Sequence, residues 1–268
     1  MSRPVRYAIC ILVALIFVLP LLAMVVIAFT PRESILDDGA SLWSGDWTLA
    51  NFSGLFGQFP VWRWFGNALL VASLTTALSV VVNLLGGYAL AKLRFRGRST
   101  VLLVVLGTLV VPVQVVMIPQ FELVARLGLV GFFWAVILPS ASTALGLFLA
   151  RQFFIDFPDE IVEAARVDGC TTLQAFRRVV VPNARPLVAV MTLLAFMAQW
   201  NDFLWPLITL RDPDLYTLPV ALRLLQTAYD NDYGGIMAMA LLSSLPLVLM
   251  FVVLQRYFVA GISRSGIR

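Results

Sequence analysis

The stretch that decides the fold covers residues 158–182 and reads PDEIVEAARVDGCTTLQAFRRVVVP. Pro158 has a φ angle suited to a helix start, and the acidic residues that follow it place negative charge at the positive end of that helix. Gly169 stands where a left-handed residue commonly ends a helix. We therefore predict a helix of about three turns between these two residues. Its apolar face consists of Ile161, Val162, Ala164, Ala165 and Val167.

A second short helix is predicted after the glycine. Thr171 and Gln174 have the spacing of a capping box, in which each side chain bonds to the backbone N–H of the other residue. The apolar residues that recur at helical intervals are Leu173, Phe176, Val179 and Val180. The pattern ends at Pro182. A polar loop of residues 153–186 is thus expected to contain two capped helices between apolar segments, and we expect a partner outside the bilayer to bind it.

The rest of the chain has the composition of a membrane protein. Hydrophobic residues make up 60% of the 268 residues and charged residues 13%, which lies outside the usual range of soluble domains. A helix that crosses the hydrocarbon core needs about 20 apolar residues. Continuous apolar runs of this kind predict helices rather than barrel strands, so we predict an all-α membrane protein with six transmembrane helices in a single domain, residues 1–268. The six stretches are residues 7–29, 65–91, 100–121, 127–150, 187–210 and 235–255.

Prolines inside these stretches predict bends, because each one removes a backbone hydrogen bond and clashes with the preceding turn. They are Pro112 and Pro119 in the third stretch, Pro139 in the fourth, Pro206 in the fifth and Pro246 in the sixth. A bend can serve gating or be a static feature of a helix bundle.

Basic residues orient the predicted spans. With the N-terminus in the cytoplasm, fourteen of the nineteen Lys and Arg residues fall on the inner side and five on the outer side, as the positive-inside rule requires. Both termini and the capped loop are then expected to be cytoplasmic. Because the topology accounts for the net charge of +4, no nucleic-acid partner is expected. The first apolar run, 22 residues from Ala8 to Phe29, is longer than that of a signal peptide and is expected to be retained.

The sequence lacks the residues that mark several classes of protein function. The chain contains no histidine, which removes the common zinc sites and the His-based triads. It has no Gly-x-x-x-x-Gly-Lys-Ser/Thr loop, so we expect no ATP hydrolysis, no cofactor and no metal ion on this chain, and no enzyme activity. The predicted spans carry no relay of ionisable residues apart from Asp202, unlike proton-driven carriers. The driving force is therefore expected to come from a partner.

The segments Glu163-Ala164-Ala165, Gly169 and Val181-Pro182 resemble the EAA loop of permease subunits in bacterial ATP-binding-cassette (ABC) importers. Residues 199–207 (QWNDFLWPL) and 255–261 (QRYFVAG) are similar to the carbohydrate-uptake branch of the maltose-permease type. The resemblance implies a type I ABC importer fold in the bacterial inner membrane, with the EAA loop as a cytoplasmic coupling helix. The residues that it assigns to coupling are Glu163, Ala164, Ala165, Asp168, Gly169 and Pro182. The alternative is that this segment is only a solvated loop.

The same resemblance implies the partners and the solute. The partners are a second permease subunit, two ATP-binding subunits that carry ATP and Mg²⁺, an extracytoplasmic solute-binding protein and membrane lipid. The solute is a sugar or oligosaccharide that crosses by alternating access. A glycerophosphate, a polyol or an amino sugar is the alternative within this class, and an autonomous channel or secondary carrier is the alternative outside it.

Polar residues at membrane depth are candidates for the solute pathway, because each must find a partner or face a wet cavity. They are Asn83, Gln114, Gln199, Trp200, Asn201 and Asp202, with Ser140, Ser142 and Thr143 in the fourth stretch and Trp205 as a further ring for stacking. The same side chains can instead tie helices together, and Asp202 can instead orient a loop at the outer end of its span.

Overall fold

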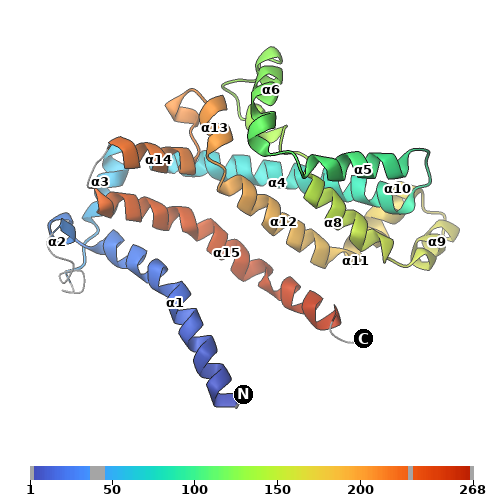
Figure 1. The fold of residues 1–268 in the computed structure, drawn as a ribbon, viewed down its shortest axis with the longest axis horizontal. Helices are drawn as coiled ribbons and strands as arrows, with labels where there is room; N and C mark the ends of the chain where they lie inside the picture. Colours follow the sequence, from blue (N-terminus) through green and yellow to red (C-terminus); the bar gives the residue numbers. More distant parts are fainter. Residues whose placement is uncertain (1–2, 37–45, 229–231, 266–268) are drawn as a thin grey trace. The chain divides into compact units, whose positions relative to one another are not determined.

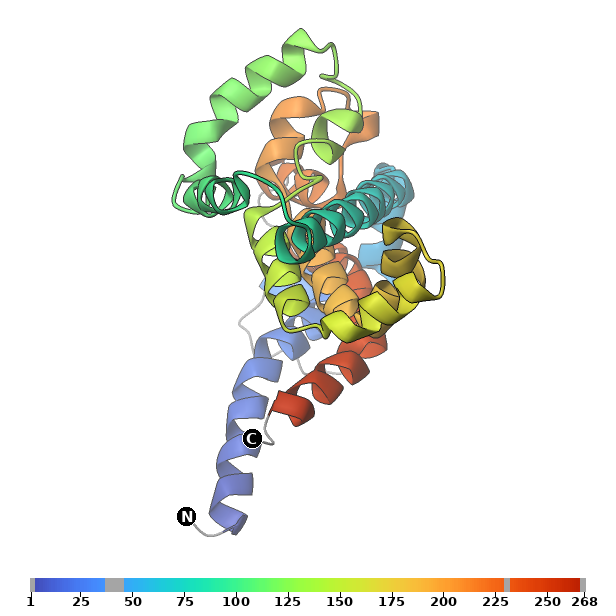
Figure 2. The same ribbon diagram turned by 90° about the vertical axis from the view of Figure 1, so that its right-hand side faces the viewer.

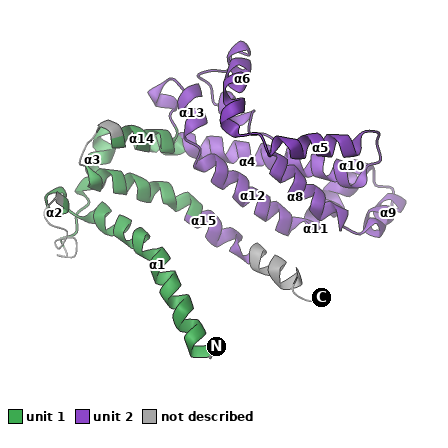
Figure 3. Ribbon diagram, viewed as in Figure 1, with its two compact units in different colours: residues 1–66, 217–247 green, residues 67–216, 248–268 purple. Residues whose placement is uncertain are grey.

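The computed structural model describes residues 3–36, 46–228 and 232–265. Every regular element in this part of the chain is helical (Figure 1), which confirms the predicted all-α class. The chain divides into two compact units: unit 1 is residues 1–66 with 217–247, and unit 2 is residues 67–216 with 248–268 (Figure 3). Arg268, one of the fourteen Lys and Arg residues that we predicted on the inner side, lies outside the described part.

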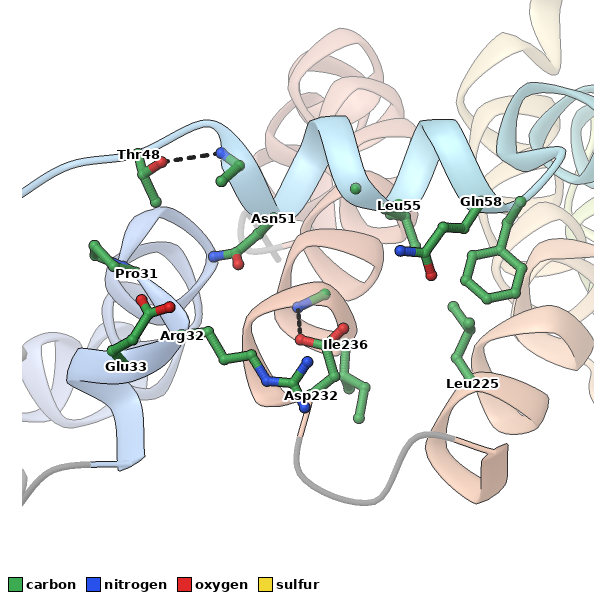
Figure 4. Close-up of a pocket in the computed structure, with 14 residues that line it drawn as sticks. Pro31, Arg32, Glu33, Thr48, Asn51, Leu55, Gln58, Leu225, Asp232 and Ile236 are labelled. Atoms are coloured by element: carbon green, nitrogen blue, oxygen red, sulfur yellow. Dashed lines mark hydrogen bonds between the residues drawn. The ribbon is translucent and has the colours of Figure 1, made fainter.

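Unit 1 contains the first helices of the chain and the start of its last one. Its helices are α1 (Arg3–Phe29), α2 (Arg32–Leu36), α3 (Ala50–Gln58), the first turn of α4 (Val61–Lys92), α14 (Leu218–Ala228) and the first half of α15 (Tyr233–Ser265). The Asn51 side chain of α3 donates to the carbonyl oxygens of Ala28 (2.9 Å) and Thr30 (2.8 Å), which ties α3 to the end of α1. A pocket of about 370 Å³ beside Asn51 is lined by Arg32 and Asp232, among others (Figure 4).

Unit 2 contains the rest of α4 and a series of shorter helices. They are α5 (Arg98–Thr108), α6 (Val113–Arg126), α7 (Trp134–Ile137), α8 (Ala144–Ile155), α9 (Asp159–Val167), α10 (Thr172–Ala175), the π-helix η2 (Phe176–Val180), α11 (Val181–Asn183), α12 (Arg185–Trp200), α13 (Leu204–Thr209) and the 3₁₀ helix η3 (Pro213–Leu215). The second half of α15 completes it. In Figure 2 the yellow segment from α9 to α11 folds back as a loop of short helices.

Two apolar clusters of described residues hold unit 2 together. The larger one joins α4, α8, α9, η2 and α12 around three aromatic rings, in which the Tyr88 centroid lies 4.8 Å from that of Phe176 and 5.5 Å from that of Phe154. The smaller one joins α4, α6, α7 and α13. Gly87 of α4 packs directly on α8, since a Cβ added to it would lie 2.4 Å from the Cβ of Ala150. Such a contact lets two helix backbones approach closely.

Among the described residues, three helices are long and apolar enough to cross a membrane: α1, α4 and residues Tyr233–Arg256 of α15. Two further candidates are bent pairs, α5 with α6 (105°) and residues Thr172–Asn183 with α12 (81°), so the described residues hold up to five candidate spans. The apolar helix α8 is shorter than these. The count of six spans therefore stays a prediction.

Three stretches that we predicted as single spans are interrupted rather than continuous, and in the first of them the bend that we predicted at Pro112 is confirmed. The stretch 100–121 breaks before Pro112, which has no N–H to continue the first helix. The stretch 127–150 opens with Gly128 (φ 69°) and Gly131 (φ 86°), whose left-handed conformations exclude a helix, and Pro139 follows α7. The stretch 187–210 breaks at residues 201–203 and resumes as α13, which contains Pro206.

Candidate functional site

The loop of residues 158–183 is built from short helices with defined ends. Its first helix, α9, begins within one residue of the predicted start. At the other end, Gly169 has a φ of 87° and donates to the carbonyl oxygen of Arg166, while Cys170 donates to that of Ala165, both at 3.0 Å. These are the two hydrogen bonds of a Schellman motif. The predicted left-handed glycine cap is confirmed.

The predicted capping box is also confirmed. The Thr171 hydroxyl accepts from the N–H of Gln174 at 3.3 Å, and the Gln174 side chain accepts from the N–H of Thr171 at 2.9 Å. After this single turn of α10 the chain widens into the π-helix η2. Segments of π-helix are rare and are frequently found at functional sites.

One face of the loop is packed against unit 2. Val162 and Ala165 of α9 and Phe176 and Val180 of η2 are buried. Apart from Ala165, these side chains belong to the cluster around Tyr88. The loop is therefore held against the ends of α4 and α8 by apolar burial, and its short helices are fixed in orientation.

The other face of the loop is bare. Of the residues assigned to coupling, Glu163, Ala164, Asp168, Gly169 and Pro182 are exposed, and Ala165 is buried. The predicted apolar face of α9 is buried only at Val162 and Ala165, whereas Ile161, Ala164 and Val167 are exposed. Leu173, predicted on the apolar face of the second helix, is exposed as well. Val167 and Leu173 are 87% and 66% exposed, so the prediction was wrong for these four residues. The bare face thus combines carboxylates with apolar side chains, and among the described residues Glu163 has no ion-pair partner.

An ion pair joins the start of this loop to α4. The Lys92 ammonium, on the last residue of α4, donates to the Asp159 carboxylate at 2.7 Å and to the Phe157 carbonyl oxygen at 2.6 Å. This hydrogen bond and the nearby positive charge hold the pKa of the Asp159 carboxyl below its ordinary value, with a smaller effect of Arg94. The carboxylate is therefore ionised at neutral pH.

A separate cavity of about 450 Å³ lies in unit 2. It is lined by side chains of α4, α6, α12 and α13 and of the segment 139–143. The polar lining residues are Thr75, Ser79, Gln114, Gln120, Ser140, Ser142, Thr143, Gln199 and Asp202. Trp205 supplies a ring to the wall, and its Nε1 donates to the Ala135 carbonyl oxygen at 2.9 Å, which fixes the ring.

Two buried polar atoms in this cavity have no hydrogen-bond partner within the described chain. They are Nε2 of Gln199, a residue that is 8% exposed, and the hydroxyl oxygen of Thr75, which is 2% exposed. A buried donor without a partner is costly, so such atoms call for a water or a ligand group. The arrangement suits a small molecule that carries several hydroxyl groups.

The structure brings together some of the predicted pathway residues and separates others. Gln114, Gln199 and Asp202 line the cavity. Trp200 is 1% exposed and stacks on Phe196, with ring centroids 5.5 Å apart, and it does not line the cavity. Asn201 also lies outside the lining and donates to the Met197 carbonyl oxygen at 2.8 Å.

Asn83 lies beside the cavity and ties its wall together. Its Nδ2 donates to the Ser79 hydroxyl at 2.9 Å, and its Oδ1 accepts from the Ser142 hydroxyl (3.1 Å) and from the Thr143 N–H (3.3 Å). The Asn83 amide therefore links α4 to the segment before α8. Thr75 and Ser79 were missed in the sequence, although with Asn83 they recur every four residues and form a polar stripe on one face of α4.

Comparison with known proteins identifies the family. The family model described as binding-protein-dependent transport system inner membrane component matches residues 79–264. The arabinooligosaccharides transport system permease protein AraQ of Halalkalibacterium halodurans is 37% identical, over 96% of this chain and 93% of that protein. The lactose transport system permease protein LacG of Rhizobium radiobacter is 34% identical, over 97% and 95%. The sn-glycerol-3-phosphate transport system permease protein UgpE of Shigella flexneri is 30% identical, over 93% and 92%.

A solved structure has the same fold. A chain in the crystal structure of a bacterial ABC transporter involved in the import of the acidic polysaccharide alginate superimposes with a TM-score of 0.84, covering 96% of this chain and 99% of that one, at 24% sequence identity. The family match, the relatives that align over almost the whole chain and the shared fold agree with one another. The chain therefore belongs to the binding-protein-dependent transport system inner membrane components, the permease subunits of ABC importers.

Proposed function

We propose that this chain is one of two permease subunits in an ATP-driven importer that takes up a sugar or an oligosaccharide. A solute-binding protein delivers the solute from outside, and two separate ATP-binding subunits hold ATP and Mg²⁺ and hydrolyse the nucleotide. The chain forms one domain of six spans in the inner membrane of a bacterium, with both termini in the cytoplasm. The observation that carries the proposal is the loop of capped helices with one buried and one bare face.

The bare face of the loop is suited to bind an ATP-binding subunit. Glu163 and Asp168 are exposed carboxylates that can accept charge-assisted hydrogen bonds from basic residues of a partner. Ala164 and Gly169 allow the partner's backbone to approach closely, while Val167 adds apolar area. The buried face packs the loop against α4, α8 and α12. A displacement of α9 therefore moves these helices. Closure of the ATP-binding subunits then switches the spans between inward-open and outward-open states.

The coupling role of the loop can be tested in a reconstituted importer. In proteoliposomes that contain the complete complex, Glu163→Ala and Gly169→Pro are expected to abolish ATP-driven uptake while membrane insertion stays normal. Proline cannot adopt the φ of 87° at position 169, so the second change removes the cap. Glu122→Ala, which removes an exposed acid from α6, serves as the control. Wild-type uptake in both loop variants would refute the proposal.

The polar cavity is proposed as part of the solute pathway. Gln114, Gln199 and Asp202 offer hydrogen bonds to sugar hydroxyls, and Trp205 offers a ring face to a pyranose. Asn83 supports the wall through its three hydrogen bonds. Trp200 and Asn201 lie outside the lining. Trp200 is buried and stacks on Phe196, whereas Asn201 is exposed and bonds to the Met197 carbonyl oxygen of its own helix.

Charge favours a sugar over a glycerophosphate as the solute. Among the described lining residues, Asp202 is the only charged one, and no Arg or Lys faces the cavity. An anionic phosphate would approach a carboxylate without a compensating cation on this subunit. A neutral sugar, a polyol or an amino sugar meets no such penalty.

Two measurements separate these solutes. A thermal-shift screen of the cognate solute-binding protein against neutral sugars, amino sugars and glycerophosphates is expected to give the largest shift with a neutral sugar or oligosaccharide. Uptake of that solute is expected to fall in Gln199→Leu and to stay near the wild-type rate in Asn201→Leu, because the second side chain does not line the cavity. Selection of a glycerophosphate, or equal uptake in both variants, would argue against the proposed solute site.

A further inference from the structure

Lys92 occupies the point where α4 meets the coupling loop. Its side chain is only 11% exposed, whereas that of Asp159 is 71% exposed. A cation is favourable at the C-terminal end of α4 and an anion is favourable at the N-terminal end of α9, because both oppose the helix dipoles there. The pair therefore joins the ends of two helices with charges that each helix end already favours.

The contact through Lys92 is directional, unlike the rest of the contact between α4 and the loop. The remaining contact consists of the apolar cluster around Tyr88, and apolar burial depends on area rather than on orientation. The ammonium group instead holds two acceptors on the loop, the Asp159 carboxylate and the Phe157 carbonyl oxygen, at 2.7 and 2.6 Å. A displacement of α9 is thus passed to α4 along defined hydrogen bonds.

The helix that receives this displacement also forms the cavity wall. α4 is one helix of 32 residues, and it carries Thr75 and Ser79 in the cavity and Lys92 at its end. The distance along the helix from Thr75 to Lys92 is about 25 Å at 1.5 Å per residue. The chain itself joins the loop to the cavity by two covalent routes, through α8 to the segment 139–143 and through α12 beyond an 81° bend. The Lys92 pair adds a third, non-covalent route, along the unbroken helix α4.

We propose that Lys92 is a positioning residue that connects the coupling loop to α4, so that movement of α9 reaches the wall of the solute cavity. The proposal rests on the function proposed above, in which the loop binds an ATP-binding subunit. Lys92 contacts neither solute nor nucleotide in this scheme. Its loss separates ATP hydrolysis from transport and leaves the binding of the ATP-binding subunits intact.

The test uses the complete importer in proteoliposomes, with ATP hydrolysis and solute uptake measured on the same sample. Lys92→Met is expected to lower the solute carried per ATP by about five-fold or more, with hydrolysis and subunit copurification at wild-type levels. Asp159→Asn is expected to fall between this variant and wild type, because the Phe157 carbonyl oxygen still accepts from the ammonium group. Lys92→Arg, which keeps the charge and the donors, is expected to restore the ratio.

Controls distinguish a lost connection from misfolding. The exposed pair of Arg126 and Glu122 on α6, with a distance of 2.6 Å, is the matched control, and Arg126→Met is expected to leave the ratio unchanged. Should Lys92→Met fail to fold or lose the ATP-binding subunits, the ratio measured for Asp159→Asn decides, because that side chain is exposed and the change is nearly isosteric. A wild-type ratio in the folded variants overturns the proposal. Failure of the proposed function would give a different result from failure of the Lys92 proposal, because the wild-type importer itself would then show no ATP-driven uptake.

Discussion

Substitution of Gly87 by alanine tests the close packing of α4 on α8. The added Cβ would lie 2.4 Å from the Cβ of Ala150 and 2.7 Å from the backbone nitrogen of Arg151. Because one of these atoms belongs to the backbone, the two helices must separate by about 1 Å to reach ordinary van der Waals contact. Overpacking of this kind costs about 1–3 kcal/mol, which corresponds to a fall in melting temperature of about 3–10 °C.

Gly86→Ala is the matched control for this change. Its Cβ would lie 3.0 Å from Cδ1 of Leu147, the end of a flexible side chain that can move away. Both variants gain the same helix propensity of alanine over glycine, so their difference isolates the clash. The assay is the thermal stability of the detergent-solubilised complex, followed by size-exclusion chromatography after heating. A Gly87→Ala protein as stable as Gly86→Ala would refute the reasoning.

Three further predictions concern single residues. Asn83→Leu is expected to cost about 1–3 kcal/mol in thermal unfolding, since three polar groups lose their buried partner; unchanged stability would contradict the role of this amide. Thr171→Ala is expected to cost about 1 kcal/mol and to speed hydrogen exchange in α10, and equal exchange rates would contradict the capping role. The contribution of Asp159, whose pKa is lowered by Lys92 and Arg94, is complete above about pH 4 and is lost as the pH falls through that lowered pKa. The difference in melting temperature between wild type and Asp159→Asn should therefore be constant from about pH 8 to 5 and vanish at lower pH. A difference that grows on acidification would contradict the prediction, because the pH dependence would then be the reverse of the expected one.

The ends of the loop helices were predictable because each depends on a few consecutive residues. A left-handed glycine at Gly169 and the box of Thr171 and Gln174 form in the structure as the sequence indicated. The packed face was harder to predict. The helical period placed Leu173 with Phe176, but the π-helix that begins at Phe176 changes the period, and Leu173 faces outward.

The cavity could be predicted only in part, because its walls come from helices that the sequence does not place together. Gln114, Gln199 and Asp202 were found from their depth in apolar stretches. Gln120, which was missed, reaches the same cavity through α6, which follows a 105° bend. Pro112 indicates where that bend occurs, but no local signal sets its angle, which depends on packing between α6 and α7.

The most direct test of the central claim is photo-crosslinking from the bare face of α9. A photoreactive amino acid replaces Val167, which is 87% exposed, in an importer that still takes up solute in the presence of ATP. The same amino acid at Leu103 of α5, which is 66% exposed, serves as the control. An adduct with the ATP-binding subunit from position 167 and none from position 103 is the predicted result. An active importer that gives no such adduct from position 167 would contradict the claim that this loop joins the permease to its motor.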